Sequence, residues 1–420
     1  MRASTRRTAL QVGLAATAAG GAAFAAWRFR KQPIRVGVLH SLTGTMSLSE
    51  RPVVDATLFA IELVNQSGGL LGRRVEPVVV DGRSDGQHFA READALLRRG
   101  DISVVFGCWT SASRKSVVPV FERHRHLLVY PVQYEGLEQS PNVIYTGAAP
   151  NQQIIPAVAW AFENVGRSFF LVGSDYVFPR TANEITKDQL RAIGATLVGE
   201  QYLPLGSRDV DACVRAIVEA RPSVILNTIN GDTNLAFFRA LRAAGITPSR
   251  IPTVSFSIGE PELQSLGDAD VAGDFAAWNY FQSIASAKNR AWISAFRQRY
   301  GANRTLSDPM EAAFVGVQLW AQAVRSIGEF SPRAARLGML SQSVEAPEGV
   351  VAIDADTGHC WKSVRIGRAR RDGQFDIVWN SDRPARPEPF PIYRSEAEWQ
   401  RFLRALYEGW GARWSAPARG

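Results

Sequence analysis

A regular alternation of short apolar runs and longer amphipathic segments begins at Ile34, and it constrains the fold more than any other feature of the sequence. The apolar runs at residues 34–39, 75–80, 102–106 and 127–130 predict buried strands, and the segments that separate most of them predict helices. Strands that alternate with helices form mostly parallel sheets. We therefore expect an α/β protein.

The alternation starts again after Ala148-Ala149-Pro150, which reads as a crossing linker. A helix at 154–165 and a strand at 169–172 open this second unit, and its strand-end loops are expected at 173–176, 227–232 and 255–260. The same architecture is thus used twice. The sequence predicts two Rossmann-like, doubly wound lobes that face each other across a cleft and move about a hinge.

The predicted lobes are discontinuous along the chain. Residues 34–150 and 279–345 are assigned to the first lobe, residues 151–278 and 346–391 to the second, and residues 392–420 to a C-terminal helix and tail. An antiparallel hairpin is expected late in the chain, where runs at 361–366 and 375–379 flank Arg371-Asp372-Gly373. The last helix, at 396–407, is compatible with packing on the body or with an accessory surface.

Residues 1–33 differ in composition from the rest. Arg2, Arg6 and Arg7 precede an uncharged stretch rich in alanine and glycine, and Ala23-Phe24-Ala25 fits a cleavage site, so this segment predicts an export signal. The Arg6-Arg7 pair resembles a twin-arginine (Tat) signal, although Ala9 stands where a bulkier apolar residue is usual. The alternative is an uncleaved membrane anchor flanked by residues 27–31.

Composition excludes several function classes. The 420 residues are 46% hydrophobic with a formal charge of +8, and removal of the three N-terminal arginines would leave +5, so nucleic-acid binding is not favoured. Cys108, Cys213 and Cys360 are too scattered for a disulfide framework or a metal site. We expect no metal and no disulfide scaffold.

An enzymatic reading finds little support. The first strand is followed by His40-Ser41-Leu42-Thr43-Gly44 rather than a glycine-rich phosphate loop, so no nucleotide cofactor is expected. Cys108 lies near basic residues at a predicted helix start, but a cysteine between a strand and a helix is more often a packed hydrophobe than a nucleophile. The carboxylate pairs Glu135 with Glu138 and Asp175 with Asp232 have no diagnostic spacing.

The predicted strand ends are instead rich in aromatic rings, hydroxyls, amides and acids. The carboxyl ends of parallel strands are where an open α/β sheet places its ligand. Ser111 is expected to cap the helix that follows the strand at 102–106. The candidate ligand-binding residues are Trp109, Thr110, Ser111, Tyr130, Gln133, Tyr134, Asp175, Tyr176, Asn230, Asp232, Glu260 and Tyr280.

Several strings in these loops carry a family resemblance. They are FGCWTSASRK at 106–115, YPVQYEG at 130–136, SPN at 140–142, GAAPNQQ at 147–153 and GSDYVFPR at 173–180. In this order they resemble the type I periplasmic substrate-binding proteins of ABC transporters, in the branch that binds urea and short-chain amides. The resemblance runs from about Ile34 to Pro391.

The resemblance implies a mechanism and a partner. An amide would lie between lobes that close by hinge motion, and the closed form would dock on ABC permease subunits in the membrane. Trp109, Ser111 and Tyr130 would frame the amide, and Asp175 and Tyr176 would face them. No cofactor is implied, and the protein would act in the periplasm.

Three alternatives remain open at this point. An amide sensor would bind a regulatory partner, but Trp109 and the export signal favour transport. A branched-chain amino-acid binder would clamp a carboxylate with Ser111 and an ammonium with Asp175. An amide hydrolase would use Cys108 as its nucleophile.

Overall fold

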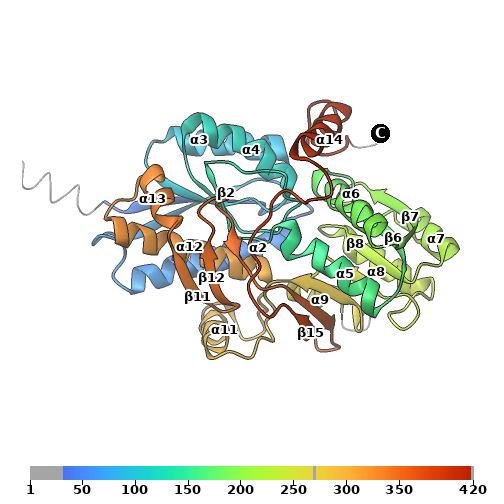
Figure 1. Cartoon of the computed structure of the whole chain (residues 1–420). Coiled ribbons are helices and arrows are strands. Elements are labelled where there is room, and N and C mark those ends of the chain that lie inside the picture. The colour runs from blue at the N-terminus through green and yellow to red at the C-terminus, as the bar shows by residue number, and fades with distance from the viewer. Residues whose placement is uncertain (1–31, 268–270, 418–420) are drawn as a thin grey trace, which may run out of the picture.

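The computed structural model describes residues 32–267 and 271–417 and consists of two α/β lobes side by side with a helix above them (Figure 1). The expected export signal therefore lies almost entirely outside the described residues. Within the described residues, no helix is long and apolar enough to cross a membrane.

The first lobe is built on a five-stranded parallel sheet with the order β2-β1-β3-β4-β5. Its strands are β1 (Ile34–His40), β2 (Val75–Asp81), β3 (Ile102–Gly107), β4 (Leu128–Tyr130) and β5 (Val143–Tyr145). Every residue of β3 is buried, because helices cover both faces of the sheet. The predicted first four strands are confirmed, whereas β5 was not predicted from the sequence.

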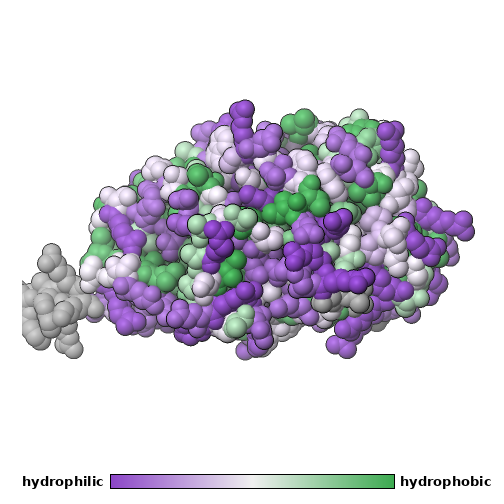
Figure 2. Space-filling model, turned by 90° about the horizontal axis from the view of Figure 1, so that it is seen from below, coloured by the Kyte–Doolittle hydropathy of each residue, from purple (hydrophilic) through white to green (hydrophobic). Residues whose placement is uncertain are grey.

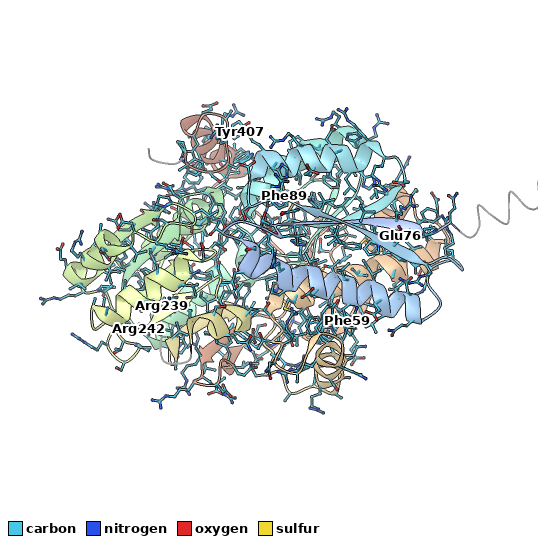
Figure 3. All side chains as sticks on the ribbon, turned by 180° about the vertical axis from the view of Figure 1, so that it is seen from behind. Phe59, Glu76, Phe89, Arg239, Arg242 and Tyr407 are labelled. Atoms are coloured by element: carbon cyan, nitrogen blue, oxygen red, sulfur yellow. The ribbon has the colours of Figure 1, made fainter. Side chains whose placement is uncertain are left out.

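Helices pack on the two faces of this sheet. They are α2 (Ser47–Gln66), α3 (Gly86–Arg98), α4 (Ser111–His124), α11 (Ala287–Tyr300), α12 (Asp308–Ile327) and α13 (Pro332–Met339). Figure 3 shows Phe89 on α3 and Phe59 on α2 on opposite sides of the sheet. The Phe59 ring lies 5.5 Å from that of Phe296, which joins α11 to the core.

The second lobe is built on a seven-stranded sheet with the order β15-β14-β10-β9-β8-β6-β7. Its strands are β6 (Ser168–Ser174), β7 (Thr196–Leu203), β8 (Val224–Thr228), β9 (Thr253–Ser255), β10 (Phe275–Trp278), β14 (Arg365–Ala369) and β15 (Phe375–Asn380). The predicted hairpin is present as the antiparallel pair β14 and β15. The helices of this lobe are η1 (Pro150–Gln152), α5 (Ile154–Asn164), α6 (Val177–Ala192), α7 (Asp211–Ala220), α8 (Thr233–Ala243) and α9 (Glu260–Leu266).

One predicted lobe boundary is wrong. A small antiparallel sheet of β11 (Ser343–Ala346), β12 (Gly349–Ile353) and β13 (Cys360–Trp361) packs Val351, Ile353 and Cys360 into the core of the first lobe. The sequence assigned residues 346–391 to the second lobe. The link between this small sheet and the first sheet is a bridge between His359 and Tyr145 of β5, a long-range contact that the strand pattern of the sequence does not indicate.

The chain crosses between the lobes after β5, after β10 and after β13, and Asn279 joins the three crossings. Its side-chain amide donates to the carbonyl oxygens of Gln152 at 3.0 Å and Ser363 at 2.8 Å. Asp308 accepts hydrogen bonds from the backbone N–H groups of Asn279 and Tyr280. The buried amide of Asn279 and the buried carboxyl of Asp308 therefore both help to tie the crossings together.

The chain ends in α14 (Glu396–Gly409) and a tail that is described to Pro417. Ser395 and Glu398 form a capping box that fixes the start of this helix. On the molecular face seen from below, hydrophilic side chains dominate and hydrophobic ones form separate patches (Figure 2). That face therefore has no continuous apolar surface.

Candidate functional site

The two lobes contact each other along a seam formed by the loops that follow their strands. Trp109 Nε1 lies 3.5 Å from Asn230 Oδ1, and Ser49 Oγ donates to Glu262 Oε1 at 2.7 Å. Gln133 Nε2 donates to the carbonyl oxygen of Phe256 at 2.8 Å. Thr45 also donates to Asp232 across the seam. The lobes are therefore closed on each other.

The turn from β3 to α4 places Trp109 at the seam. Cys108 has a φ of 66°, in the left-handed region that non-glycine residues seldom adopt, and its N–H donates to the carbonyl oxygen of Leu39. Thr110 is extended and accepts from the N–H of Ser113 at 3.0 Å, so it caps α4. The expectation that Ser111 is the cap is wrong, because Ser111 is already the first helical residue.

Ser111 belongs to a buried cluster of charges behind the turn. Its hydroxyl donates to Glu135, and the fully buried Arg114 lies 2.8 Å from Glu138 and 3.2 Å from Glu135. Lys115 is 3.1 Å from Glu138. Two cations thus face two carboxylates, and the cluster is neutral.

The electrostatics of this cluster follow from burial and pairing. Burial works to raise the pKa of Glu138, but Arg114 and Lys115 outweigh it and hold the pKa at about 2. Burial works to lower the pKa of Arg114, yet Glu138 and Glu135 raise it well above its ordinary value. These charged groups are therefore paired with one another rather than directed at the seam.

Tyr130 and Tyr176 bring aromatic rings from both lobes to this place. The Tyr130 hydroxyl donates to the carbonyl oxygen of Trp109 at 2.6 Å, and its ring lies 4.8 Å from the Arg114 guanidinium. Burial raises the pKa of Tyr176 well above its usual value, and Tyr130 and Glu135 add to that shift from across the seam. The structure thus brings Trp109, Ser111, Tyr130 and Tyr176 together.

Two predicted aromatic walls, Tyr134 and Tyr280, direct their hydroxyls into the core of the first lobe. The Tyr134 hydroxyl interacts with His359 and donates to the carbonyl oxygen of Glu138, within a stack of rings that includes Tyr145. The Tyr280 hydroxyl donates to Asn289 at 2.7 Å inside the first lobe. Both side chains use their polar atoms within that core. A tyrosine at a strand end does not reveal from sequence which side it faces.

The acidic candidates are all engaged. Asp175 forms an ion pair with Arg180 at 2.8 Å, and Asp232 accepts from Thr45. Glu260 accepts from the N–H of Gln282 at 2.7 Å, and burial raises its pKa to about 8. Glu260 is therefore neutral near pH 7, as a buried carboxylic acid.

Several polar atoms at or behind the seam have no hydrogen-bond partner within the described residues. They include Gln133 Oε1, Ser257 Oγ and His40 Nε2, and these three are buried. His40 shares its other nitrogen with Glu50 at 3.0 Å. Buried polar groups without a partner call for one, and a bound molecule can supply it.

Sequence reasoning missed the part that the loop after β1 and the start of α2 play in the seam. Thr45 and Ser49 contact the second lobe, where Glu262 accepts the hydrogen bond from the Ser49 hydroxyl. The polar composition of residues 41–45 was the available signal, since that loop also follows a parallel strand. Nothing in the sequence indicated Glu262 as a seam residue, because its partner Ser49 lies more than two hundred residues earlier in the chain.

Cys108 is a packed side chain. It is fully buried, and burial raises the pKa of its thiol above the ordinary value, so the thiol stays protonated at neutral pH. The nucleophile in cysteine chemistry is the thiolate. Cys108 therefore offers no activated sulfur.

A family model described as the periplasmic binding protein domain matches residues 34–396. A Leu/Ile/Val-binding protein homolog of Brucella abortus is 20% identical over 346 residues, which are 76% of this chain and 82% of that protein. A limonene hydroxylase of Geobacillus stearothermophilus is 30% identical over 124 residues, 30% of this chain and 23% of that protein. The chain thus spans less than a quarter of the hydroxylase.

Solved structures of similar fold include two solute-binding proteins. One, of an ABC transporter from Rhodopseudomonas palustris in complex with 4-hydroxybenzoate, has a TM-score of 0.76 at 20% identity and covers 84% of this chain and 98% of its own. The other, a branched-chain amino acid transporter protein from Streptococcus pneumoniae with isoleucine, has a TM-score of 0.72 at 18% identity and covers 83% and 99%.

These matches agree with the architecture, which is the two-lobed α/β fold of type I periplasmic binding proteins. The family model covers far more than half of the chain, including both lobes and all the seam residues named above. The chain belongs to the periplasmic binding protein domain family.

Proposed function

We propose that this protein is the exported solute-binding protein of an ABC importer and that it closes its lobes on urea or a short aliphatic amide. The observation that carries the ligand class is the contrast between charged and neutral groups at the seam. Arg114, Lys115, Glu135 and Glu138 neutralise one another, whereas Gln133 Oε1 and Ser257 Oγ, which have no partner within the described residues, belong to side chains that carry no charge.

A small amide matches that set of groups. It offers N–H donors and one carbonyl oxygen in a plane. Gln133 Oε1 and His40 Nε2 can accept from its N–H groups, and the hydroxyls of Ser257 and Tyr176 can donate to its oxygen. The rings of Trp109 and Tyr130 supply flat apolar walls.

Branched-chain amino acids or aromatic acids are the second candidate class, because the relative from Brucella and the two solved structures carry such names or ligands. Such a ligand brings a carboxylate into the seam. The residues expected to clamp an amino acid are already occupied, since Ser111 donates to Glu135 and Asp175 is paired with Arg180. This occupation favours a neutral ligand.

Titration calorimetry of the purified protein with urea, acetamide, isoleucine and 4-hydroxybenzoate tests the proposal. We expect heat of binding with urea or acetamide. Ser257→Ala and Tyr176→Phe should each weaken binding about three- to tenfold, the loss typical of one hydrogen bond. Tyr407→Phe on α14 is the matched control and should bind normally. Binding of isoleucine or 4-hydroxybenzoate alone would overturn the amide assignment while leaving solute binding intact.

Whether the protein is exported distinguishes the transport function from the alternative function as an amide sensor. The proposal expects the protein in the periplasm, with a new N-terminus after Ala25. Mass spectrometry of the protein recovered from a periplasmic fraction reads this directly. An intact N-terminus on protein in the cytoplasm would support the amide sensor instead.

A further inference from the structure

The C-terminal helix α14 lies between α4 of the first lobe and α6 of the second, on the side of the molecule away from β15 and α11 (Figure 1). Its Trp399 is fully buried. Trp399 shares a hydrophobic cluster with Ala112 and Leu137 of the first lobe and with Phe178 of the second. The family match ends at residue 396, where this helix begins. A segment outside the matched region therefore packs on both lobes.

The contacts with the second lobe include ion pairs and backbone hydrogen bonds. Arg394 forms ion pairs with Asp188 at 2.6 Å and with Glu184, both on α6. Further along, the tail runs antiparallel to the loop that precedes α6. The N–H of Val177 donates to the carbonyl oxygen of Trp414, and the N–H of Ala416 donates to that of Asp175, both at 3.0 Å. The tail thus pairs as a short strand with the loop that carries Tyr176.

The polar contacts with the first lobe are fewer and start from side chains. Gln400 Nε2 donates to the carbonyl oxygen of Leu137 at 3.2 Å. The ammonium of Lys115 lies 5.1 Å from the centre of the Trp414 ring. Tyr407, labelled in Figure 3, supports that ring from α14, with the two ring centres 4.6 Å apart. Lys115 therefore links the tail to the buried charge cluster of the first lobe.

We propose that residues 394–416 form a C-terminal latch that is carried on the second lobe and holds the seam closed by gripping the first. Opening the lobes separates Tyr176 from Lys115 and Leu137, so one set of latch contacts must break. Backbone hydrogen bonds and ion pairs anchor the latch to the second lobe. The side-chain contacts to Leu137 and Lys115 are the set that releases.

The latch would regulate access to the same seam to which we assign ligand binding, and this consequence rests on the proposed function. The tail covers the backbone of the loop that holds Tyr176, and Trp414 lies against Lys115 of α4. A ligand would then enter or leave only while the Lys115 and Leu137 contacts are broken. Weakening the latch should speed exchange of the ligand in both directions.

The experiment measures opening without any ligand, so that its outcome does not depend on ligand identity. Spin labels at Gln87→Cys on α3 and Arg215→Cys on α7 report the distance between the lobes by pulsed electron resonance. Both positions are exposed, and the three native cysteines are buried. Truncation after Ala412, combined with Gln400→Ala, removes the polar contacts to both Lys115 and Leu137 but retains α14 and the buried Trp399. Trp414→Ala and Ala416→Pro remove single contacts.

We expect the truncated protein, Trp414→Ala and Ala416→Pro to show a broader distribution shifted to longer distances than the intact chain. Arg413→Ala, at an exposed position beside Trp414, should leave the distribution unchanged. Circular dichroism and the melting temperature confirm that each variant is folded. Unchanged distances in the folded truncated protein would overturn the latch while leaving the ligand assignment untouched. If the intact protein binds no amide but the variants still show longer distances, the ligand assignment would be overturned and the latch would stand.

Discussion

The buried carboxyl of Glu260 is one residue that makes the stability of the protein depend on pH. Burial raises its pKa from 4.5 to about 8, so the folded state holds this proton more tightly than the unfolded state. The stabilisation from the protonated acid is complete below pH 4.5 and is lost as pH rises to about 8. Glu260 also accepts from the N–H of Gln282, which a neutral amide oxygen can replace.

Glu260→Gln should therefore make the protein more stable than wild type at pH 8.5, by about 1–3 kcal/mol, and leave it nearly unchanged at pH 4. Guanidinium denaturation at both pH values measures this, and urea is avoided because it is a proposed ligand. Asp274 also has its pKa raised to about 6, but its neighbours are the same in both proteins, so its contribution cancels in the comparison. Equal stability of variant and wild type at pH 8.5 would contradict the prediction.

The buried Arg114 is the residue on which the charge cluster depends. Arg114→Met should cost about 3–5 kcal/mol of unfolding free energy, because it leaves Glu135 and Glu138 buried with only Lys115 as a counter-charge. Adding Glu138→Gln should recover part of that loss. Guanidinium denaturation of the single and double variants checks both steps, and a single variant as stable as wild type would refute the role of the cluster.

At the scale of elements, the end of β3 is fixed against β1 by a glycine. A side chain at Gly107 would place its Cβ 2.3 Å from the carbonyl oxygen of Leu39. Gly107→Ala should therefore push the two strand ends apart, cost about 1–3 kcal/mol and displace Trp109 from the seam. Thermal denaturation and amide titration measure the two effects. Gly409→Ala on α14 is the control, since a Cβ at that position would have no other heavy atom within 4 Å.

The elements that could be predicted from sequence are those whose signals are local. The strands at the start of each lobe and the β14–β15 hairpin are marked by apolar runs and by a turn, and the parallel sheet rule then puts Trp109 and Tyr130 on one edge. Pairings across long stretches of chain leave no such mark. The sequence did not reveal that Asp175 forms an ion pair with Arg180, that β12 packs on the first lobe, or that the Trp414 ring contacts Lys115.

At the scale of the whole molecule, closure rests on a few hydrogen bonds across the seam in addition to the latch. Thr45 donates to Asp232 and Ser49 to Glu262, so the loop after β1 and the start of α2 hold the second lobe directly. Each such bond contributes about 0.5–1.5 kcal/mol, which corresponds to a few-fold to about tenfold change in the ratio of closed to open protein.

Thr45→Val keeps the shape of the side chain and removes only the hydroxyl that reaches Asp232. We expect the ligand-free variant to open more often, which small-angle X-ray scattering would record as a larger radius of gyration. Because only the closed form completes the site, the apparent affinity for an amide should fall by the same factor as the closed population. Thr196→Val, on the exposed side of β7, is the matched control and should change neither quantity. A variant that opens more yet binds an amide as tightly as wild type would show that the ligand is held by one lobe alone.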